Sequence, residues 1–240
     1  PLEALMRWTA RSSAALTTAT EGLYEYFRER PDLAMTVPNG ASADALELLN
    51  QKDALVAEYP GRPRAVYIGL FGYNHKLSTV LDAALLLPNV EFVFVGDGPD
   101  RPLLEQAARE LPNVEVLSFR PLEDLVSLYH SATVLISHVR KDSIFKWTQP
   151  AKLWEYMASS RPVVHAGEGE VVDIIESERI GITVPPEDSK ALAAAIEKVV
   201  CDRRLATELG SRGRQYVELK RNSATIFTAM EELLKTVARH

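Results

Sequence analysis

Lys152 and Glu155, which follow a proline, are of the residue types that bind nucleotides. On a helix their spacing of three puts both side chains on one face, which Ser159 is expected to share. Pro150 fits the first turn of that helix, where a proline loses no hydrogen bond. A helix N-terminus offers unpaired N–H groups and partial positive charge to a phosphate. The pair could therefore bind a diphosphate and ribose hydroxyls, or it could be a solvated surface pair.

A basic loop precedes this helix. Arg140, Lys141 and Lys146 fall within the polar stretch 138–149. Cationic side chains beside a phosphate site would stabilise the charge that builds on a departing diphosphate. The alternative is an ordinary solvated loop.

Patterns for other cofactors are missing. No spacing of side chains matches a zinc site, and no Asp-x-Asp pair ends a strand, so we expect no essential metal. His75 and His138 stand in no recognisable group of partners. The glycines of residues 69–72 do not form G-x-G-x-x-G, which disfavours a nicotinamide cofactor.

Short apolar runs alternate with amphipathic stretches from residue 64 onward, and this pattern predicts an α/β domain. Such strands form a parallel sheet that is covered on both faces and doubly wound, with its ligand crevice at their carboxyl ends. The predicted strands are 65–69, 92–95, 114–117, 134–136, 162–164 and 181–184, and helices are predicted over 76–87, 102–111, 122–131, 150–159 and 171–177.

The two ends of the chain differ from this pattern. Residues 1–35 predict a helix, a short strand at 15–17 and another helix. The turn at 37–40 predicts a boundary near residue 38. From residue 188 the pattern is helical, with breaks near Asp202 and Lys220.

Composition places the chain among soluble globular proteins. Hydrophobic residues make up 46% and charged residues 25% of the chain, as is ordinary for that class. A net charge of -6 argues against general nucleic-acid binding, which needs excess Lys and Arg. One cysteine excludes an internal disulfide, and no apolar run approaches the length of a membrane span. We expect a cytoplasmic protein, and the start at Pro1 indicates a fragment or a processed chain.

Four segments carry a resemblance to a known family. Residues 148–164 resemble the P-x-K-x-x-E-Y-M-A-x-x-x-P-V-V segment of family 4 glycosyltransferases with the GT-B fold. Residues 37–40 resemble the family's domain linker, 95–99 its V-G-D-G-P loop, and 181–188 its G-x-x-V-x-P-x-D segment. Their order and spacing cover roughly residues 36 to 200.

The resemblance implies a half that binds a nucleoside diphosphate sugar, the donor substrate, without a metal or another cofactor. Glu155 would hold the ribose, Lys152 would lie by the diphosphate, and the loop after the third strand would touch the base. With Arg140 from the basic loop, the candidate nucleotide-sugar-binding residues are Glu155, Lys152, Lys76, Gly96, Gly98, Arg120, Pro121, Leu122, Arg140 and Pro150.

The resemblance also implies how the whole protein is organised. Residues 1–37 would be the remnant of an N-terminal acceptor domain with the linker, 38–220 the nucleotide-sugar domain, and 221–240 a helix returning toward the first domain. The implied reaction moves a sugar, with retention, to a lipid-linked or polysaccharide acceptor in surface glycan synthesis. This chain alone is expected to be inactive, and any attachment to the inner face of the membrane would use the missing domain.

Two departures from the family pattern concern the donor sugar. The family has two glutamates eight positions apart, and Trp147 stands at the first of them, so that carboxylate is absent unless Asp142 replaces it. Leu70 and His75 stand where an Arg and a Lys are common, and Lys76 could reach phosphate after a one-residue shift. Similar departures occur in a branch of cell-surface polysaccharide transferases.

Two other functions stay open. One is a non-catalytic subunit that supplies a nucleotide site to a split transferase. The other is a nucleotide-sugar epimerase on the same fold, although the five histidines form no visible group that would serve it.

Overall fold

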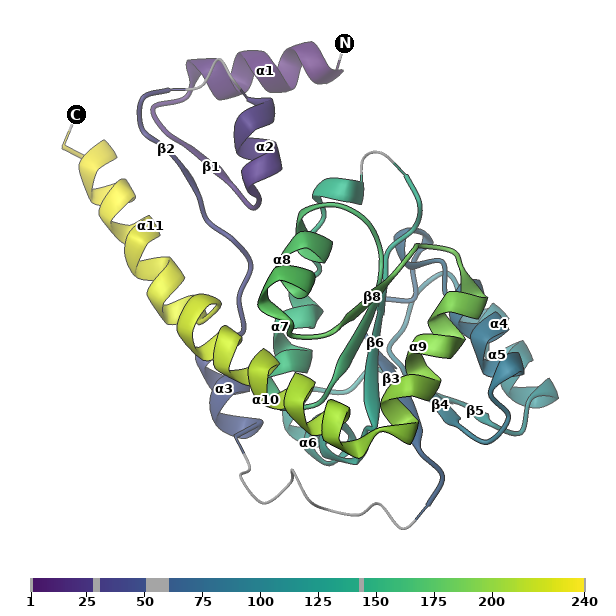
Figure 1. The fold of residues 1–240 in the computed structure, drawn as a ribbon. Helices are drawn as coiled ribbons and strands as arrows, with labels where there is room; N and C mark the ends of the chain where they lie inside the picture. The colour runs from purple at the N-terminus through teal and green to yellow at the C-terminus, as the bar shows by residue number, and fades with distance from the viewer. Residues whose placement is uncertain (1, 28–30, 51–60, 143–144, 240) are drawn as a thin grey trace.

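The computed structural model describes residues 2–27, 31–50, 61–142 and 145–239. Its main feature is a six-stranded sheet, all parallel, in the order β5-β4-β3-β6-β7-β8 (Figure 1). The strands are β3 (Arg64–Ile68), β4 (Glu91–Val95), β5 (Val114–Leu117), β6 (Val134–His138), β7 (Val163–Ala166) and β8 (Ile182–Val184). The predicted doubly wound α/β fold is confirmed, with each predicted strand shifted by two residues at most.

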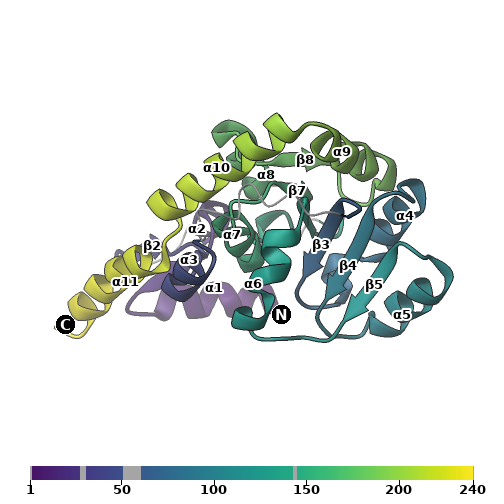
Figure 2. The same ribbon diagram turned by 90° about the horizontal axis from the view of Figure 1, so that it is seen from below.

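Helices cover both faces of this sheet (Figure 2). Alternate strand residues point to opposite faces, so Ala65 and Tyr67 enter one core and Val66 and Ile68 the other. The first core is covered by α4 (Ser78–Leu86), α5 (Arg101–Glu110) and α9 (Ser189–Cys201). The second is covered by α3 (Ala43–Leu48), α6 (Leu122–Ser131), α7 (Ala151–Ala158), α8 (Glu170–Glu178) and the end of α10 (Arg203–Lys220).

A second, two-stranded sheet lies apart from the first, on the side of α8 and α11 (Figure 1). Its parallel strands are β1 (Leu16–Thr18) and β2 (Ala34–Thr36), accompanied by α1 (Leu2–Ser12) and α2 (Glu21–Tyr26). Sequence patterns missed β2 and α3, because three- and six-residue elements carry too little periodicity and depend on their packing partners.

The C-terminal helix α11 (Ser223–Val237) begins beside the segment that joins the two sheets. Ala41 forms an isolated parallel bridge with Asn222, and its N–H donates to Arg221 O at 2.8 Å. Phe227 and Leu234 on this helix are exposed. Within the described ranges, no helix is long and apolar enough to cross a membrane.

Gly96 and Gly98 let the loop after β4 lie against the loop after β3. A Cβ on Gly96 would stand 1.9 Å from Gly69 O, and one on Gly98 would stand 2.5 Å from Phe71 O. Both glycines also have positive φ, +152° and +146°. The two loops are joined by hydrogen bonds from Gly69 N–H to Val95 O and from Phe71 N–H to Asp97 O, both 2.8 Å.

The Gly96→Ala substitution should therefore lower the free energy of unfolding by about 2 kcal/mol or more, because the methyl group meets backbone atoms that cannot move alone. Urea denaturation measures this loss. Gly72→Ala is the matched control, since its φ is negative and its Cβ would first meet the side chain of exposed Leu70 at 3.1 Å. Equal losses for the two variants would contradict the steric account.

Candidate nucleotide-binding site

The strand order reverses between β3 and β6, and the carboxyl ends of these two strands are where a doubly wound sheet is expected to form its ligand crevice. These strands pair only at Ala65 with Val134 and at Val66 with Leu135. Beyond that point the Tyr156 hydroxyl fills the gap: it accepts from Ile68 N–H and donates to Ile68 O, each at 2.7 Å. Tyr156 thus fixes α7 at the mouth of the crevice.

Lys152 projects from the first turn of α7 over the end of β3. Its Nζ donates to the Tyr67 hydroxyl at 2.5 Å and lies 4.0 Å from the centre of that ring. The Tyr67 hydroxyl in turn donates to Leu70 O at 2.8 Å. A Cβ on Gly69 would stand 2.7 Å from Nζ, so glycine leaves the room that the ammonium occupies.

The Lys152 cation has no counter-ion in the described part of the chain. Among the described residues no carboxylate lies within ion-pair distance, and burial lowers its pKa to about 7. No side chain caps the start of α7, where Pro150 is the residue before the helix and lies buried. A desolvated ammonium beside an uncapped helix N-terminus favours an anion.

Glu155 follows one turn later on the same helix and is half-buried. Its carboxylate makes no hydrogen bond or ion pair with any described residue, and burial raises its pKa. Such a group gains from a ligand that donates hydroxyl hydrogens. Ser159 does not share this accessible face, contrary to expectation, because it is buried and its Oγ donates to Tyr156 O at 2.6 Å.

Lys76, a candidate phosphate contact, is paired with a carboxylate in this structure. Its Nζ forms an ion pair with Glu187, whose other oxygen accepts from Lys141 N–H at 3.0 Å. The hydrogen bond from Lys76 is the main reason that the pKa of Glu187 is lowered. Both partners have left-handed backbone, with φ of +36° and +62°. No local pattern predicts this pair, because 111 residues separate its members.

Arg140, in the predicted basic loop, contacts the loop after β3. Its guanidinium carbon is 3.7 Å from the centre of the Tyr73 ring, and its Nε donates to Tyr73 O at 3.1 Å. Tyr73 itself is exposed. The loop after β6 is thereby joined to the loop after β3.

The predicted base-contacting loop lies further along the same edge. Arg120 and Pro121 are exposed between β5 and α6, and Leu122 is the first residue of α6. Arg120 also borders a hollow of about 270 Å³ along α6, with Asp124 and Leu128. These residues follow β5, which lies two strands from β3, and Lys152 projects over the end of β3.

Three buried histidines stand behind the crevice. His75 Nδ1 lies 3.1 Å from His138 O, and His138 Nε2 accepts from Glu187 N–H at 3.1 Å. Burial lowers the pKa of His75 and His138 to about 4 and that of His165 to about 3, so all three are neutral at pH 7. His75 and His138 join the loops after β3 and β8 to the end of β6, whereas His165 Nδ1 lies 3.0 Å from Ser137 Oγ in the neighbouring strand.

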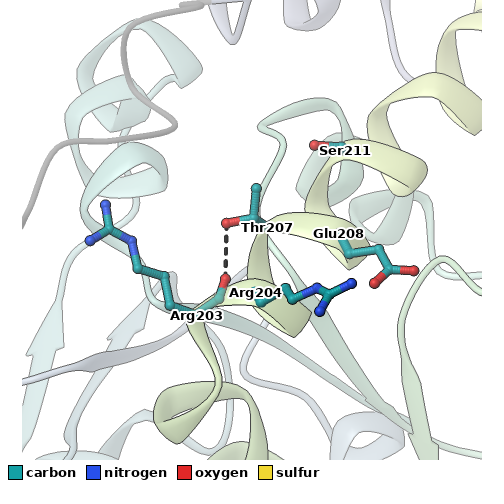
Figure 3. Close-up of a pocket in the computed structure, with 5 residues that line it drawn as sticks. All are labelled: Arg203, Arg204, Thr207, Glu208 and Ser211. Atoms are coloured by element: carbon teal, nitrogen blue, oxygen red, sulfur yellow. Dashed lines mark hydrogen bonds between the residues drawn. The ribbon is translucent and has the colours of Figure 1, made fainter.

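A separate hollow of about 580 Å³ lies on α10 (Figure 3). One helix supplies all of its lining, and Thr207 Oγ1 donates to Arg203 O at 2.9 Å within it. Helix α9 runs from the carboxyl ends of the strands back to their amino ends (Figure 1). The first turn of α10 therefore lies at the amino ends of the strands, away from the nucleotide crevice. Among the described residues no group of three or more His, Cys, Asp or Glu could hold a metal.

Comparison with known families identifies the family of this chain. The family model Glycosyl transferases group 1 matches residues 62–202, more than half of the chain. The chain belongs to this family. The matched range contains the crevice, Lys152 and Glu155.

Individual group 1 relatives agree with this assignment. The capsular polysaccharide biosynthesis glycosyltransferase CapM of Staphylococcus aureus is 23% identical over 167 residues, which are 69% of this chain and 39% of that protein. The chain spans about a third to a half of the length of its curated relatives.

Solved structures show the same fold. A sucrose-phosphate synthase from Thermosynechococcus elongatus superposes with a TM-score of 0.79 at 22% identity, covering 99% of this chain and 61% of that one. HepE of Anabaena, in complex with UDP and glucose, superposes with a TM-score of 0.74 at 18% identity, covering 94% and 64%. The fold is thus that of the GT-B glycosyltransferases.

Proposed function

We propose that this chain is the donor half of a retaining, family 4 glycosyltransferase and binds a nucleoside diphosphate sugar in the crevice between β3 and β6. One observation carries the proposal: the Lys152 ammonium is buried, and no carboxylate of the described residues lies within ion-pair distance of it. It stands one turn before Glu155, whose carboxylate bonds to none of the described residues. A diphosphate supplies the missing negative charge, and ribose hydroxyls supply the missing donors. The UDP in the crystal of HepE supports the same ligand class.

The chemistry assigned to the site is stabilisation of a leaving group. The bond between the anomeric carbon and the diphosphate oxygen breaks, and the acceptor oxygen forms the new bond on the same face. The proton of the acceptor hydroxyl passes to the departing diphosphate. Lys152 and the N–H groups at the start of α7 hold the negative charge that develops on the diphosphate, and Arg140 stands at the rim. No metal or other cofactor is assigned a part.

The whole protein's role extends this proposal. Residues 1–37 would belong to an acceptor-binding half, residues 38–220 to the donor half, and 221–240 to a helix that contacts both. The acceptor would be a glycan or a lipid-linked sugar in surface polysaccharide synthesis at the cytoplasmic side of the membrane, in keeping with relatives such as CapM. The chain alone would bind the donor and transfer no sugar.

Calorimetric titration with UDP, GDP and ADP tests the site and identifies the base. For the diphosphate that binds, the 2′,3′-dideoxy form should bind about 10- to 100-fold more weakly, because the Glu155 carboxylate loses its hydroxyl partners. The Glu155→Ala variant should bind both forms equally weakly.

The control is Glu178→Ala, which removes an exposed carboxylate at the far end of α8. It should bind like the parent protein. The proposal fails if none of the three diphosphates binds, or if Glu155→Ala still distinguishes the two forms of the ligand.

A further inference from the structure

Glu170, at the start of α8, joins parts of the chain that are distant in sequence. Its Oε1 accepts from Gln149 Nε2 at 2.8 Å, and its Oε2 accepts from the N–H of Gly22 in α2 at 3.2 Å. The carbonyl of Gln149 accepts in turn from Asn39 Nδ2 at 2.8 Å. The Glu170 carboxylate therefore links α2 to Gln149, two residues before α7, and Gln149 in turn contacts the connecting segment through Asn39.

A second contact reinforces the same link. Trp147, in the 3-10 helix η3 (Phe145–Trp147), lies against α2, with its ring centre 5.3 Å from that of Tyr26. A Cβ on Gly22 would stand 2.8 Å from the indole, so glycine allows the close approach. Trp147 thus faces α2 at the position where the family pattern has a glutamate.

Gln149 transmits this link to the nucleotide site. It is buried, with 4% of its surface exposed, and it immediately precedes the proline that begins α7. Its Oε1 has no partner, so the bond from Nε2 to Glu170 is the one side-chain hydrogen bond that holds it among the described residues. Lys152 follows three residues later, within the first turn.

We propose that Glu170 is a positioning residue of the nucleotide site, which sets the start of α7 through Gln149 and couples it to α2. The assignment of diphosphate as the ligand rests on the proposed function. The coupling itself rests on the contacts of Glu170 and Trp147. A shift of α2 relative to the six-stranded sheet then changes the contacts that Lys152 and the N–H groups at the start of α7 make with the ligand.

The first test needs no ligand. Amide hydrogen exchange, followed by mass spectrometry, is measured for residues 149–156 in the parent protein, Glu170→Ala and Glu178→Ala. Exchange there should be at least about fivefold faster in Glu170→Ala and unchanged in Glu178→Ala, because only the former frees Gln149. Unchanged exchange in Glu170→Ala overturns the inference, whatever nucleotide binding shows.

The second test uses UDP as the probe and a double-mutant cycle. Glu170→Ala should weaken UDP binding about tenfold, and Glu170→Gln should restore most of it, since Gln149 can turn its unpartnered amide oxygen toward the new amide. If Glu170 acts through Gln149, the double variant Glu170→Ala, Gln149→Ala should bind no more weakly than the weaker single variant. Additive losses overturn the inference. Failure of the parent to bind any of UDP, GDP and ADP, with faster exchange in Glu170→Ala, instead counts against the proposed function alone.

Discussion

UDP should bind about fifty-fold more weakly at pH 9 than at pH 7. The ammonium form of Lys152 is the form that attracts a diphosphate, and burial lowers its pKa to about 7 in the empty site. The charged fraction therefore falls from about one half to about one hundredth over this range, and the apparent affinity falls with it. Above pH 7 the diphosphate itself stays fully ionised, because its last pKa is about 6.

Other groups around Lys152 keep their charge over the same range. His75 is already neutral, because burial lowers its pKa to about 4, and burial raises the pKa of the Tyr67 hydroxyl further from neutrality. Lys152→Arg is the matched variant, since a guanidinium stays charged up to pH 12. Its affinity for UDP should change little with pH, and Lys152→Met should bind very weakly throughout.

Calorimetry at pH 7, 8 and 9, in buffers of different ionisation enthalpy, measures both affinity and proton uptake. UDP binding should take up close to one proton at pH 9 and about half a proton at pH 7. A flat pH profile for the parent protein, or a profile for Lys152→Arg as steep as the parent's, would show that Lys152 is not the titrating cation.

The Tyr156→Phe variant should lose about 2 to 4 kcal/mol of unfolding free energy. The hydroxyl of Tyr156 satisfies both backbone groups of Ile68 where β3 and β6 separate, and its removal leaves two buried polar groups without partners. Each unsatisfied group costs about 1 to 3 kcal/mol, whereas the ring itself still fills its space. Urea denaturation measures the difference.

Tyr216→Phe is the control for this loss. Tyr216 packs on Trp154, with ring centres 6.0 Å apart, and its hydroxyl bonds to no described residue. It should change stability by less than about 0.5 kcal/mol. An equal effect of the two substitutions would mean that the bridge to Ile68 contributes nothing.

The order of strands and helices follows from the sequence, because parallel strands buried on both faces must be uninterrupted apolar runs. Each predicted helix of the sheet domain lies within two residues of its predicted bounds, and breakers such as Pro99 and Gly181 stand between elements. The glycines at 96 and 98 were also visible as a motif, but the reason for them was not. They are needed because the loop after β3 passes within contact of both.

Local patterns of 4 to about 18 residues were enough to predict the sheet domain and the helix that presents Lys152 and Glu155. The partners of each charged side chain became visible only in the folded chain. Lys152 has no counter-ion among the described residues, whereas Lys76 pairs with Glu187 and Gln149 donates to Glu170. These outcomes depend on which distant loops meet above the strand ends, and charge pairing across such distances leaves no periodic trace in the chain.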